Sequence, residues 1–329
     1  MVVEDVTSDT EVLVVGGGPG GYVAAVRAAE RGADVTLIER DALGGVCLNH
    51  GCIPSKALLS ATGLADRAGD AERMGIYADP RIEADETRRW TDSVVRRLTR
   101  GVELLCERAG VTVVDGTATF EGPDRLRVGD ATMDFERAVL ATGSRPIELP
   151  GVPFDATGVV DSRAALALDS VPDRLVVVGG GYVGMELATV FARLGTDVAV
   201  AEMEAEVLPG FPADLAAPVR ERAESAGVAV HLNHRATGHR ETGEGVEVAL
   251  DGPDGERSLV GDTVLVAVGR EPVVDTLSPD AAGLSTDEQG FLPTDDTQET
   301  PVDGIFAVGD AAGEPMLAHA AMHEGRIAA

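Results

Sequence analysis

Two cysteines, Cys47 and Cys52, are separated by four residues in the segment Gly-Gly-Val-Cys-Leu-Asn-His-Gly-Cys-Ile-Pro-Ser-Lys, which ends at Lys56. A disulfide closing so short a loop would contribute only about 2 kcal/mol through chain entropy, so a purely structural role explains it poorly. Two cysteines do not complete a zinc site, and Cys106 is the only other cysteine. The pair is interpreted as redox-active, with a structural disulfide and a metal site or inert thiols as the alternatives.

The backbone around the cysteines is expected to form a distorted or interrupted helix start. Residues five apart on a regular helix have Cα atoms roughly 8–9 Å apart, beyond the ~7 Å limit for a disulfide. Pro54 suits the first turn of a helix better than its interior. A helix N-terminus and a nearby cation make a thiol more reactive. Lys56 lies in the same segment, and it is the only lysine among the 27 Lys and Arg residues.

Two copies of one glycine-rich pattern predict the elements that position this segment. Each copy combines an apolar strand, a glycine-rich turn, a helix and a second strand that leads to an acid. The first copy predicts strands over 11–15 and 34–39 around a helix over about 22–31. The second predicts strands over 174–178 and 197–200 around a helix that reaches about residue 194. A constant offset of 163 residues relates one set to the other: Gly16, Gly18, Gly21, Ala25 and Glu39 to Gly179, Gly181, Gly184, Ala188 and Glu202.

The glycines in this pattern have separate physical roles. The first makes a tight turn, the second lets the backbone approach a pyrophosphate, and the third lets helix and strand pack closely. The helix N-terminus supplies N–H donors for the phosphates, and the acid can accept a hydrogen bond from a ribose hydroxyl. Two complete copies therefore predict two dinucleotide sites. The acid-rich segment from Glu202 to Glu206 contains no arginine, so it would repel a 2′-phosphate and favour NAD over NADP.

Composition narrows the class of protein. A net charge of −29 and a pI near 4.4 over 329 residues argue against nucleic acid or an anionic membrane as partner. Acidic excess with a single lysine resembles proteins of a salt-rich cytoplasm, where self-repulsion is screened; an ordinary acidic enzyme is the alternative. Residues 1–6 contain no basic leader, which argues against a secretory signal. No apolar run approaches the ~20 residues of a membrane-spanning helix. Three cysteines fit a reducing compartment. These features predict a cytoplasmic protein.

Further elements follow from periodicity. A helix between the two copies has apolar residues at helical spacing, namely Val94, Val95, Leu98, Val102, Leu105 and Cys106. This makes Cys106 a core thiol, with a regulatory thiol as the alternative. Segments 111–120, 125–128 and 132–141 are predicted to form a small meander. In both segments 141–146 and 264–272 a strand is predicted to end at a turn of small residues. The two halves of the chain, each with one glycine-rich pattern, are therefore expected to have the same arrangement of elements.

The C-terminal region adds one candidate acid and one histidine. A predicted strand over 305–308 runs into Gly309 and Asp310. Because ligands bind at the carboxyl edge of such sheets, Asp310 is expected to contact a ligand, with a helix cap as the alternative. His319, at a predicted helix start, is interpreted equally as a ligand or interface residue or as an ordinary core or cap histidine. His50 is a possible substrate contact or simply exposed.

Taken together, these motifs resemble the flavoprotein disulfide reductases of the pyridine nucleotide-disulfide oxidoreductase family, and most closely the dihydrolipoamide dehydrogenases. The resemblance covers essentially the whole chain. It implies two Rossmann-like α/β domains for FAD and NAD, each with a small antiparallel meander. By this resemblance the FAD-binding residues are Gly16, Gly18, Gly21, Glu39, Arg40, Gly45, Lys56, Thr142, Gly143, Ser144, Asp310 and Ala318. The NAD-binding residues are Gly179, Gly181, Tyr182, Gly184, Glu202 and Gly269.

The resemblance also implies chemical roles for individual residues. Cys47 would exchange with the dithiol substrate, and Cys52 would lie beside the flavin and form a thiolate–flavin charge-transfer state. Lys56 would lie near the flavin N5 as a desolvated ammonium paired with Glu186, since a buried cation needs an acid partner. Tyr182 would cover the nicotinamide pocket as a gate, and Ala318 and His319 match a motif that caps the flavin.

The resemblance predicts a division into residues 1–150 (first part of the FAD domain), 151–272 (NAD domain) and 273–329 (return to the FAD and central region). In the family a C-terminal interface domain follows, which carries a His–Glu pair for acid–base catalysis and forms the homodimer. The chain ends at Ala329, so this domain is expected to be absent. The resemblance therefore does not by itself predict that the shortened chain turns over substrate or dimerises.

The function predicted from the resemblance is NAD-dependent oxidation of dihydrolipoamide to lipoamide through a redox disulfide and FAD. The expected partners are a lipoyl-domain substrate and a 2-oxo-acid dehydrogenase or glycine-cleavage complex. Two alternatives remain at this point: an NAD(P)H-dependent disulfide reductase for another low-molecular-weight thiol, and a non-catalytic FAD-binding fragment.

Overall fold

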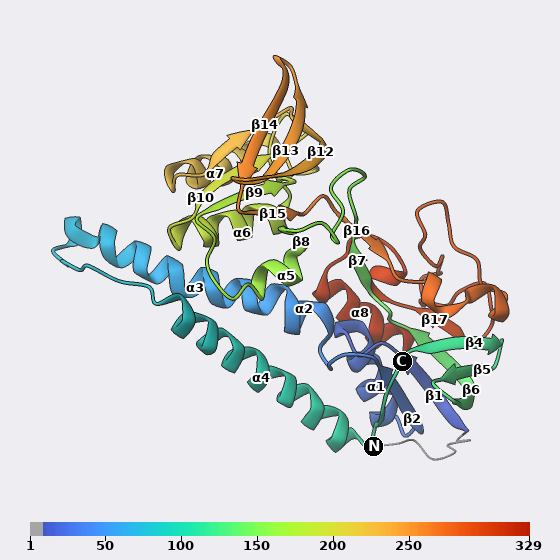
Figure 1. The fold of residues 1–329 in the computed structure, drawn as a ribbon. Coiled ribbons are helices and arrows are strands. Elements are labelled where there is room, and N and C mark those ends of the chain that lie inside the picture. The colour runs from blue at the N-terminus through green and yellow to red at the C-terminus, as the bar shows by residue number, and fades with distance from the viewer. Residues whose placement is uncertain (1–8) are drawn as a thin grey trace. The chain divides into compact units, whose positions relative to one another are not determined.

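The computed structural model describes residues 9–329, so residues 1–6, for which the sequence predicted no basic leader, lie outside the described residues. The chain divides into two compact units (Figure 1). Unit 1 comprises Met1–Asn49, Val95–Arg145 and Arg270–Ala329, and unit 2 comprises His50–Val94 and Pro146–Gly269. This grouping places residues 50–94 with the second unit. The division of the chain into FAD and NAD domains at residues 150 and 272 stays a prediction.

Unit 1 is built on a seven-stranded mixed sheet with the order β3-β2-β1-β6-β5-β4, in which β17 also pairs with β6. The strands are β1 (Thr10–Val15), β2 (Val35–Glu39), β3 (Thr112–Asp115), β4 (Ala118–Gly122), β5 (Arg125–Val128), β6 (Ala131–Leu140) and β17 (Ile305–Ala307). The ten-residue β6 belongs to two subsheets. Its first four residues pair antiparallel with β5, and Phe135–Leu140 run parallel to β1. One long strand thus joins the meander to the parallel dinucleotide sheet.

The helices of unit 1 are α1 (Pro19–Glu30), α2 (Gly45–His50), α8 (Ala318–Ala328) and the C-terminal part of α4 (Ala84–Ala109). Short 3-10 turns are η2 (Asp275–Leu277), η3 (Pro279–Ala282) and η4 (Gly309–Ala311). A separate two-stranded ladder joins β7 (Ser144–Pro146) to β16 (Arg270–Pro272). These two strands occur where the chain leaves unit 1 and where it returns.

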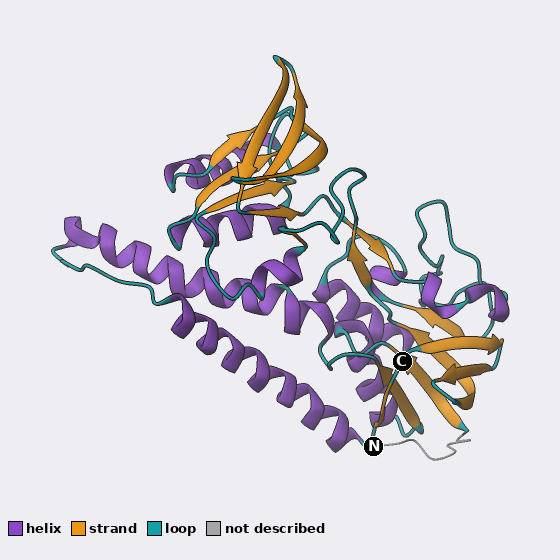
Figure 2. Cartoon of the chain, in the orientation of Figure 1, coloured by secondary structure: helices purple, strands orange, loops and turns teal. Residues whose placement is uncertain are grey.

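Unit 2 has a five-stranded parallel sheet, order β11-β10-β9-β15-β8, and an antiparallel sheet, order β12-β13-β14, visible as the long orange hairpins of Figure 2. The strands are β8 (Val159–Val160), β9 (Arg174–Val178), β10 (Asp197–Ala201), β11 (Ala229–His231), β12 (Arg235–Thr242), β13 (Gly245–Gly252), β14 (Gly255–Gly261) and β15 (Thr263–Val266). The helical segments are α3 (Cys52–Gly69), η1 (Asp70–Met74), α5 (Ser162–Leu166), α6 (Tyr182–Arg193) and α7 (Ala213–Ser225).

Both cores follow the two-residue period of buried strands. In β1, Val14 packs into the cluster that contains the α1 alanines, whereas Leu13 and Val15 join the cluster beneath the meander. In β9, Leu175 and Val177 pack with the α6 side chains, and the alternate valines face the β13 side chains. Each parallel sheet is therefore covered on both faces, which explains its nearly continuous apolar strands. The predicted fold class, two Rossmann-like units each with a small meander, is confirmed.

Three details differ from the sequence expectations. Helix α1 begins at Pro19 rather than at residue 22, because a proline at the first helical position loses no hydrogen bond. The predicted strand 111–120 is two strands, broken near Gly116 at φ 155°, and the first of them pairs with β2 in the parallel sheet. On α4, Leu98 and Leu105 are exposed, and the buried positions are Val102 and Cys106.

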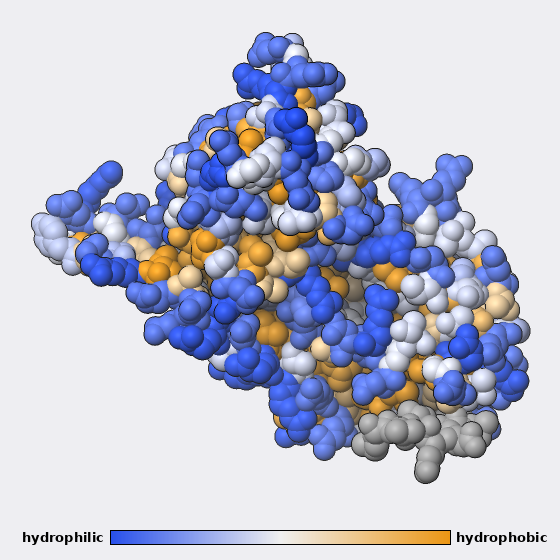
Figure 3. Space-filling view, viewed as in Figure 1, coloured by the Kyte–Doolittle hydropathy of each residue, from blue (hydrophilic) through white to orange (hydrophobic). Residues whose placement is uncertain are grey.

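Much of the surface is hydrophilic. Hydrophilic residues cover most of the face shown in Figure 3. None of the helices that the structure describes is long and apolar enough to cross a membrane.

Candidate active site

The first glycine-rich turn leaves the start of α1 open to a ligand. Gly16 has φ 100°, a conformation that favours glycine and turns the chain from β1 toward the helix. Gly18 caps α1 without a side-chain cap bond, and the first turn of α1 contains no acid. A Cβ built on Gly18 would meet no atom within 4 Å. The free N–H groups and the open space suit a pyrophosphate.

Glu39 and Glu202 have the same hydrogen-bonding arrangement in the two units. Glu39 Oε2 accepts from the Gly17 N–H at 2.6 Å, and its Oε1 accepts from the N–H groups of the next two residues at 2.8 Å. Glu202 Oε2 accepts from the Gly180 N–H at 2.6 Å, and its Oε1 accepts from the Glu204 N–H at 2.8 Å. Each carboxylate is thus fixed by one backbone donor of its own glycine-rich turn and by backbone N–H groups of the segment that follows the acid. Carboxylate oxygens retain further acceptor sites, which a ribose hydroxyl can use.

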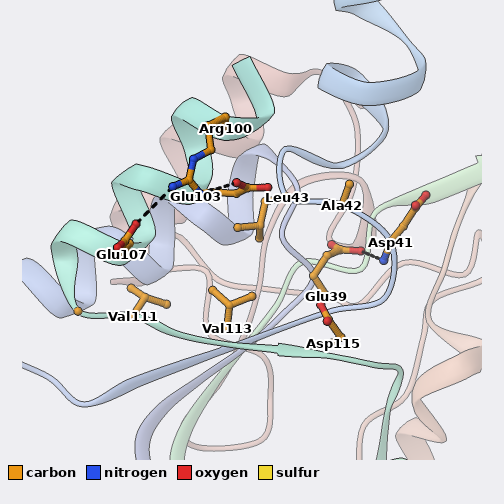
Figure 4. Close-up of a pocket in the computed structure, with 11 residues that line it drawn as sticks. Glu39, Asp41, Ala42, Leu43, Arg100, Glu103, Glu107, Val111, Val113 and Asp115 are labelled. Atoms are coloured by element: carbon orange, nitrogen blue, oxygen red, sulfur yellow. Dashed lines mark hydrogen bonds and ion pairs between the residues drawn. The ribbon is translucent and has the colours of Figure 1, made fainter. Parts of the chain in front are cut away.

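A cavity of about 550 Å³ opens beside Glu39 in unit 1 (Figure 4). Its lining comes from the ends of β2 and β3, the segment after β2, and α4, and consists of Glu39, Asp41, Ala42, Leu43, Arg100, Glu103, Glu107, Gly110, Val111, Val113 and Asp115. Arg100 is paired with Glu103 at 2.8 Å and lies 3.9 Å from Glu107. The sequence did not indicate the α4 residues of this wall, because the apolar spacing of α4 marks only its buried face.

The remaining predicted flavin residues of unit 1 lie at strand ends and helix starts. Thr142 follows β6, and its buried Oγ1 has no hydrogen-bond partner among residues 9–329. Ser144 is buried and its hydroxyl bonds to Asp310, which lies in η4 after β17. Gly143, between Thr142 and Ser144, has φ 74°. An unpartnered buried hydroxyl at this edge fits a polar ligand.

Other predicted residues of unit 1 differ in exposure. Gly45 begins α2, and a Cβ on it would lie 2.6 Å from the Cα of Gly18, so α2 starts directly against the glycine-rich turn. The side chain of Arg40 is exposed, and its backbone N–H binds Glu39. Ala318 is the first residue of α8, and His319 beside it is exposed.

The second glycine-rich turn repeats this geometry in unit 2. Gly179 has φ 106°, and Gly181 caps α6 without a side-chain bond. A Cβ on Gly181 would meet no atom within 4 Å. A Cβ on Gly184 would lie 2.0 Å from the Gly179 carbonyl oxygen, so the third glycine permits close helix packing. Tyr182, the first residue of α6, is half exposed. Gly269 follows β15 as the last residue of this unit.

The acid-rich segment after Glu202 contains no arginine itself, but an arginine from another element contacts it. Arg220 of α7 binds Glu206 at 2.9 Å and Glu224 at 3.2 Å. The hydrogen bond from Arg220 lowers the pKa of Glu206. Sequence separation concealed this contact, since Arg220 is 14 residues from Glu206. With two acids on one guanidinium, the segment remains acidic.

The cysteine segment is an interrupted helix, as predicted. Helix α2 ends at His50, Gly51 adopts φ −142° and ψ −109°, and α3 begins at Cys52. Pro54 lies in the first turn of α3, where its missing N–H removes no helical bond. Cys47 is half-buried and Cys52 exposed. Cys52 therefore lies at a helix N-terminus, where the helix dipole favours a thiolate.

Asn49 anchors α2, the helix that carries Cys47. Its Nδ2 donates to the carbonyl oxygens of Leu43 at 3.1 Å and Gly45 at 3.0 Å. Its Oδ1 accepts from the Thr99 hydroxyl of α4 at 2.8 Å. These bonds fix a helix of six residues. A helix that short is not stable by its own propensity.

Lys56 and Glu186 form a two-oxygen ion pair within unit 2. Lys56 Nζ lies 2.8 Å and 3.0 Å from the two carboxylate oxygens of Glu186 on α6. The side chains are 58% and 30% exposed, so the expected desolvation of the ammonium is not observed. Lys56 lies four residues after Cys52 on α3, which places both side chains on the same helix face.

A second charge cluster holds α3 further along its length. Asp66 Oδ2 accepts from Arg222 of α7 at 2.9 Å and lies 3.2 Å from Arg193 Nη2 of α6. Gly63 of α3 leaves room for the Arg193 guanidinium, which a Cβ would approach to 3.3 Å. Helix α3 is therefore fixed to α6 at two points ten residues apart, by ion pairs of opposite polarity.

Cys106, the third thiol, is fully buried beside the α1 alanines. Burial raises the pKa of this thiol. This is the environment of the expected core thiol. Among residues 9–329 no group of three or more His, Cys, Asp or Glu side chains could hold a metal ion.

Comparison with known proteins places the chain in a family. A family model described as pyridine nucleotide-disulphide oxidoreductase matches residues 10–325. The chain belongs to this family. Enzymes of the family use FAD and NAD. The open turns at Gly18 and Gly181, the fixed carboxylates of Glu39 and Glu202, and the unpartnered Thr142 hydroxyl fit two such dinucleotides.

Curated relatives and solved structures agree with this placement. The chain is 54% identical to dihydrolipoyl dehydrogenase 2 of Haloarcula marismortui and 52% identical to dihydrolipoyl dehydrogenase of Haloferax volcanii, covering all of this chain and 71% of each relative. The structure of LpdA from Mycobacterium tuberculosis matches with a TM-score of 0.88 at 30% identity, over 97% of this chain and 71% of that one. The HOCl-induced flavoprotein disulfide reductase RclA of Escherichia coli matches with a TM-score of 0.86 at 28% identity, over 97% and 70%.

Proposed function

We propose that this chain oxidises a dihydrolipoyl dithiol with NAD⁺ as final acceptor, through Cys47, Cys52 and bound FAD. The observation that carries the proposal is the placement of Cys52 at the first position of α3 with Lys56 one turn later, held by Glu186. The dihydrolipoyl dehydrogenases at 51–54% identity support the choice of substrate.

In this proposal the cysteines perform thiol–disulfide exchange. A substrate thiolate attacks Sγ of Cys47 in the oxidised pair, and Cys52 leaves as a thiolate. The second substrate thiolate then attacks the mixed disulfide, which releases the cyclic disulfide product and leaves Cys47 as a thiolate that takes a proton. The helix N-terminus and the Lys56 ammonium stabilise the negative charge on Cys52. Glu186 holds the ammonium in place.

The other site residues bind and orient the two dinucleotides. We assign the turn from Gly16 to Gly21, Glu39, Thr142 and Asp310 to FAD, with the cavity beside Glu39 receiving its adenosine end. The turn from Gly179 to Gly184 and Glu202 would hold NAD, with Tyr182 over the nicotinamide. Bound FAD supplies the two-electron chemistry that passes electrons from the dithiol to NAD⁺ and restores the disulfide. The carboxylate of Glu202 disfavours a 2′-phosphate and hence NADP.

The proposal extends to partners and surroundings. A lipoyl domain would deliver the dithiol, as part of a 2-oxo-acid dehydrogenase or glycine-cleavage complex. We propose a homodimer for the full-length protein and a reducing, salt-rich cytoplasm. The acidic surface and the haloarchaeal relatives support the salt-rich setting.

An anaerobic spectrum tests the proposal directly. FAD-loaded protein in high salt is mixed with dihydrolipoamide, and the visible spectrum is recorded. A long-wavelength thiolate–flavin band is expected, because exchange leaves Cys52 as a thiolate. A flavin that responds to another dithiol or to NADPH, but not to dihydrolipoamide, would overturn the substrate assignment. A flavin that binds and responds to no thiol would favour the non-catalytic alternative.

A further inference from the structure

Arg270 was not among the residues predicted to bind a cofactor, yet it contacts one of them twice. Its Nε donates to Oγ of Ser144 at 2.7 Å, and its Nη2 donates to the Ser144 carbonyl oxygen at 2.6 Å. Ser144 is buried, and its hydroxyl in turn donates to Oδ2 of Asp310. All three residues belong to unit 1. They bring together the ends of β7, β16 and β17.

The direction of the hydrogen bonds in this chain is fixed by chemistry. A guanidinium can only donate, and a hydroxyl has one proton with two acceptor lone pairs. Because Arg270 occupies a lone pair of the Ser144 oxygen, the serine proton is directed at Asp310. Both ends of the relay are charged, which makes these bonds stronger than neutral ones. The bond to Oδ2 restricts the rotation of the Asp310 carboxylate and therefore the directions in which Oδ1 can point.

A neighbouring arginine shows that the contact is specific to Arg270. Arg145 follows Ser144 but is exposed, and it pairs outward with Glu271 at 2.7 Å and Asp275 at 2.9 Å. The two arginines therefore cross between β7 and β16 in opposite directions: Arg270 toward Ser144, and Arg145 toward Glu271. Both crossings stabilise the ladder, but only Arg270 reaches Asp310 through a hydroxyl.

We propose that Arg270 is a positioning residue for FAD, which acts through Ser144 to orient the Asp310 carboxylate toward a hydroxyl of the dinucleotide. This inference rests on the assignment of Asp310 to the FAD site. Arg270 itself need not touch the cofactor. Its two donors hold the serine in one rotamer, so that Asp310 is oriented before the cofactor binds. The entropic cost of ordering the Asp310 side chain on FAD binding is therefore smaller.

Binding of FAD to the apo protein in high salt tests the proposal, measured by titration calorimetry or by the change in flavin fluorescence. Arg270→Met and Ser144→Ala are each expected to weaken FAD binding about 10-fold, the effect of a lost hydrogen bond to a charged group. The double variant is expected to bind FAD no more weakly than either single variant, because both remove the same relay. Arg270→Lys should recover only part of the affinity, since an ammonium cannot make both bonds of the fork.

Arg145→Met is the matched control, because it removes an arginine from the same ladder without touching Ser144. It is expected to leave the FAD dissociation constant within about twofold of the wild-type value, and the thermal unfolding of each apo variant reports any loss of fold. Equal losses of FAD affinity in the two arginine variants, or additive losses in the Arg270 and Ser144 double variant, would overturn the relay. Failure of the wild-type chain to bind FAD would instead overturn the proposed function.

Discussion

Lys56 lies within hydrogen-bonding distance of both carboxylate oxygens of Glu186, at 2.8 Å and 3.0 Å, so one ammonium joins α3 to α6. A lysine stem is flexible, and a single-oxygen contact would leave the ammonium several positions. Contact with both oxygens restricts Nζ to the face of α3 that also carries Cys52. Under the proposed function, this is also the helix face on which the Cys52 thiolate would form.

Glu186→Gln should slow the reaction while leaving the fold intact. The amide keeps the shape of the side chain but removes its charge, so Lys56 is held less firmly. We expect about a 10-fold lower rate of flavin reduction by dihydrolipoamide in stopped-flow absorbance. The loss in free energy of unfolding should stay below about 1 kcal/mol, because the pair is half exposed.

Asp66→Asn supplies the control for the Glu186 variant. It breaks the other ion-pair cluster between α3 and α6, ten residues from Lys56, and no proposed chemical role depends on Asp66. It should lower stability and leave the rate of flavin reduction nearly unchanged. If both variants slowed reduction equally, Glu186 would act only by holding α3 against α6.

Cys52→Ser should retain FAD and abolish the long-wavelength absorbance. The hydroxyl of serine does not ionise near neutral pH, so no thiolate is left to interact with the flavin. Cys47→Ser, the matched variant, should keep the Cys52 thiol and lose only exchange with the dithiol. Absorbance spectra of both FAD-loaded variants, with and without dihydrolipoamide, distinguish the two roles. A charge-transfer band that persists in the Cys52 variant would refute the assignment.

Much of this architecture is predictable because the signals are local. Each glycine-rich turn, its strand and its acid lie within about 30 residues, and the physical demands on them repeat at a constant offset. The helix break at Gly51 was predictable from the geometry that a close cysteine pair requires. Even the extra helical turn of α1 follows from Pro19, although the glycines around it concealed where the helix begins.

Contacts between distant segments were not predictable from one sequence. Arg220 and Glu206 meet because the fold brings α7 against the segment after β10, and nothing in their spacing indicates it. Arg270 gave a weak signal, since Gly269-Arg270-Glu271-Pro272 resembles Gly143-Ser144-Arg145-Pro146. That similarity indicated only that both turns follow a strand in the same way. It did not show that their arginines exchange partners across one ladder.

Gly18→Ala and Gly181→Ala should each remove one cofactor and spare the other. Both glycines have φ near −67°, which alanine adopts freely, and their added Cβ would meet no protein atom. The added methyl would instead occupy the space that a pyrophosphate needs. We expect at least about 10-fold weaker FAD binding for the first variant and about 10-fold weaker NADH binding for the second. Titration calorimetry with each ligand measures both.

Gly21→Ala is the contrasting change, because its Cβ would lie 1.7 Å from the Gly16 carbonyl oxygen. That variant should lose stability even without a ligand, whereas the Gly18 and Gly181 variants should unfold near the wild-type temperature. Undiminished FAD binding by the Gly18 variant would contradict the assignment of the first turn.

The buried thiol of Cys106 should make the protein less stable in alkali. Burial raises its pKa above the ordinary value of 9.0, so the thiol stays protonated in the fold while the unfolded chain releases its proton. The stabilisation is complete below pH 9 and is lost as the pH rises toward the raised value, because the unfolded state then binds fewer protons. The free energy of unfolding should fall by at most about 1.4 kcal/mol per pH unit in this range.

Urea unfolding between pH 8 and 10 measures this slope, with Cys47 and Cys52 replaced by serine so that Cys106 is the only thiol that titrates. The matched Cys106→Ala variant should be less stable at pH 8, because it leaves a small cavity. Its stability should nevertheless depend less on pH, and the difference between the two curves isolates the thiol. Equal slopes would show that Cys106 ionises as readily in the fold as in the unfolded chain. A maleimide that labels Cys106 without unfolding would lead to the same conclusion by a separate route.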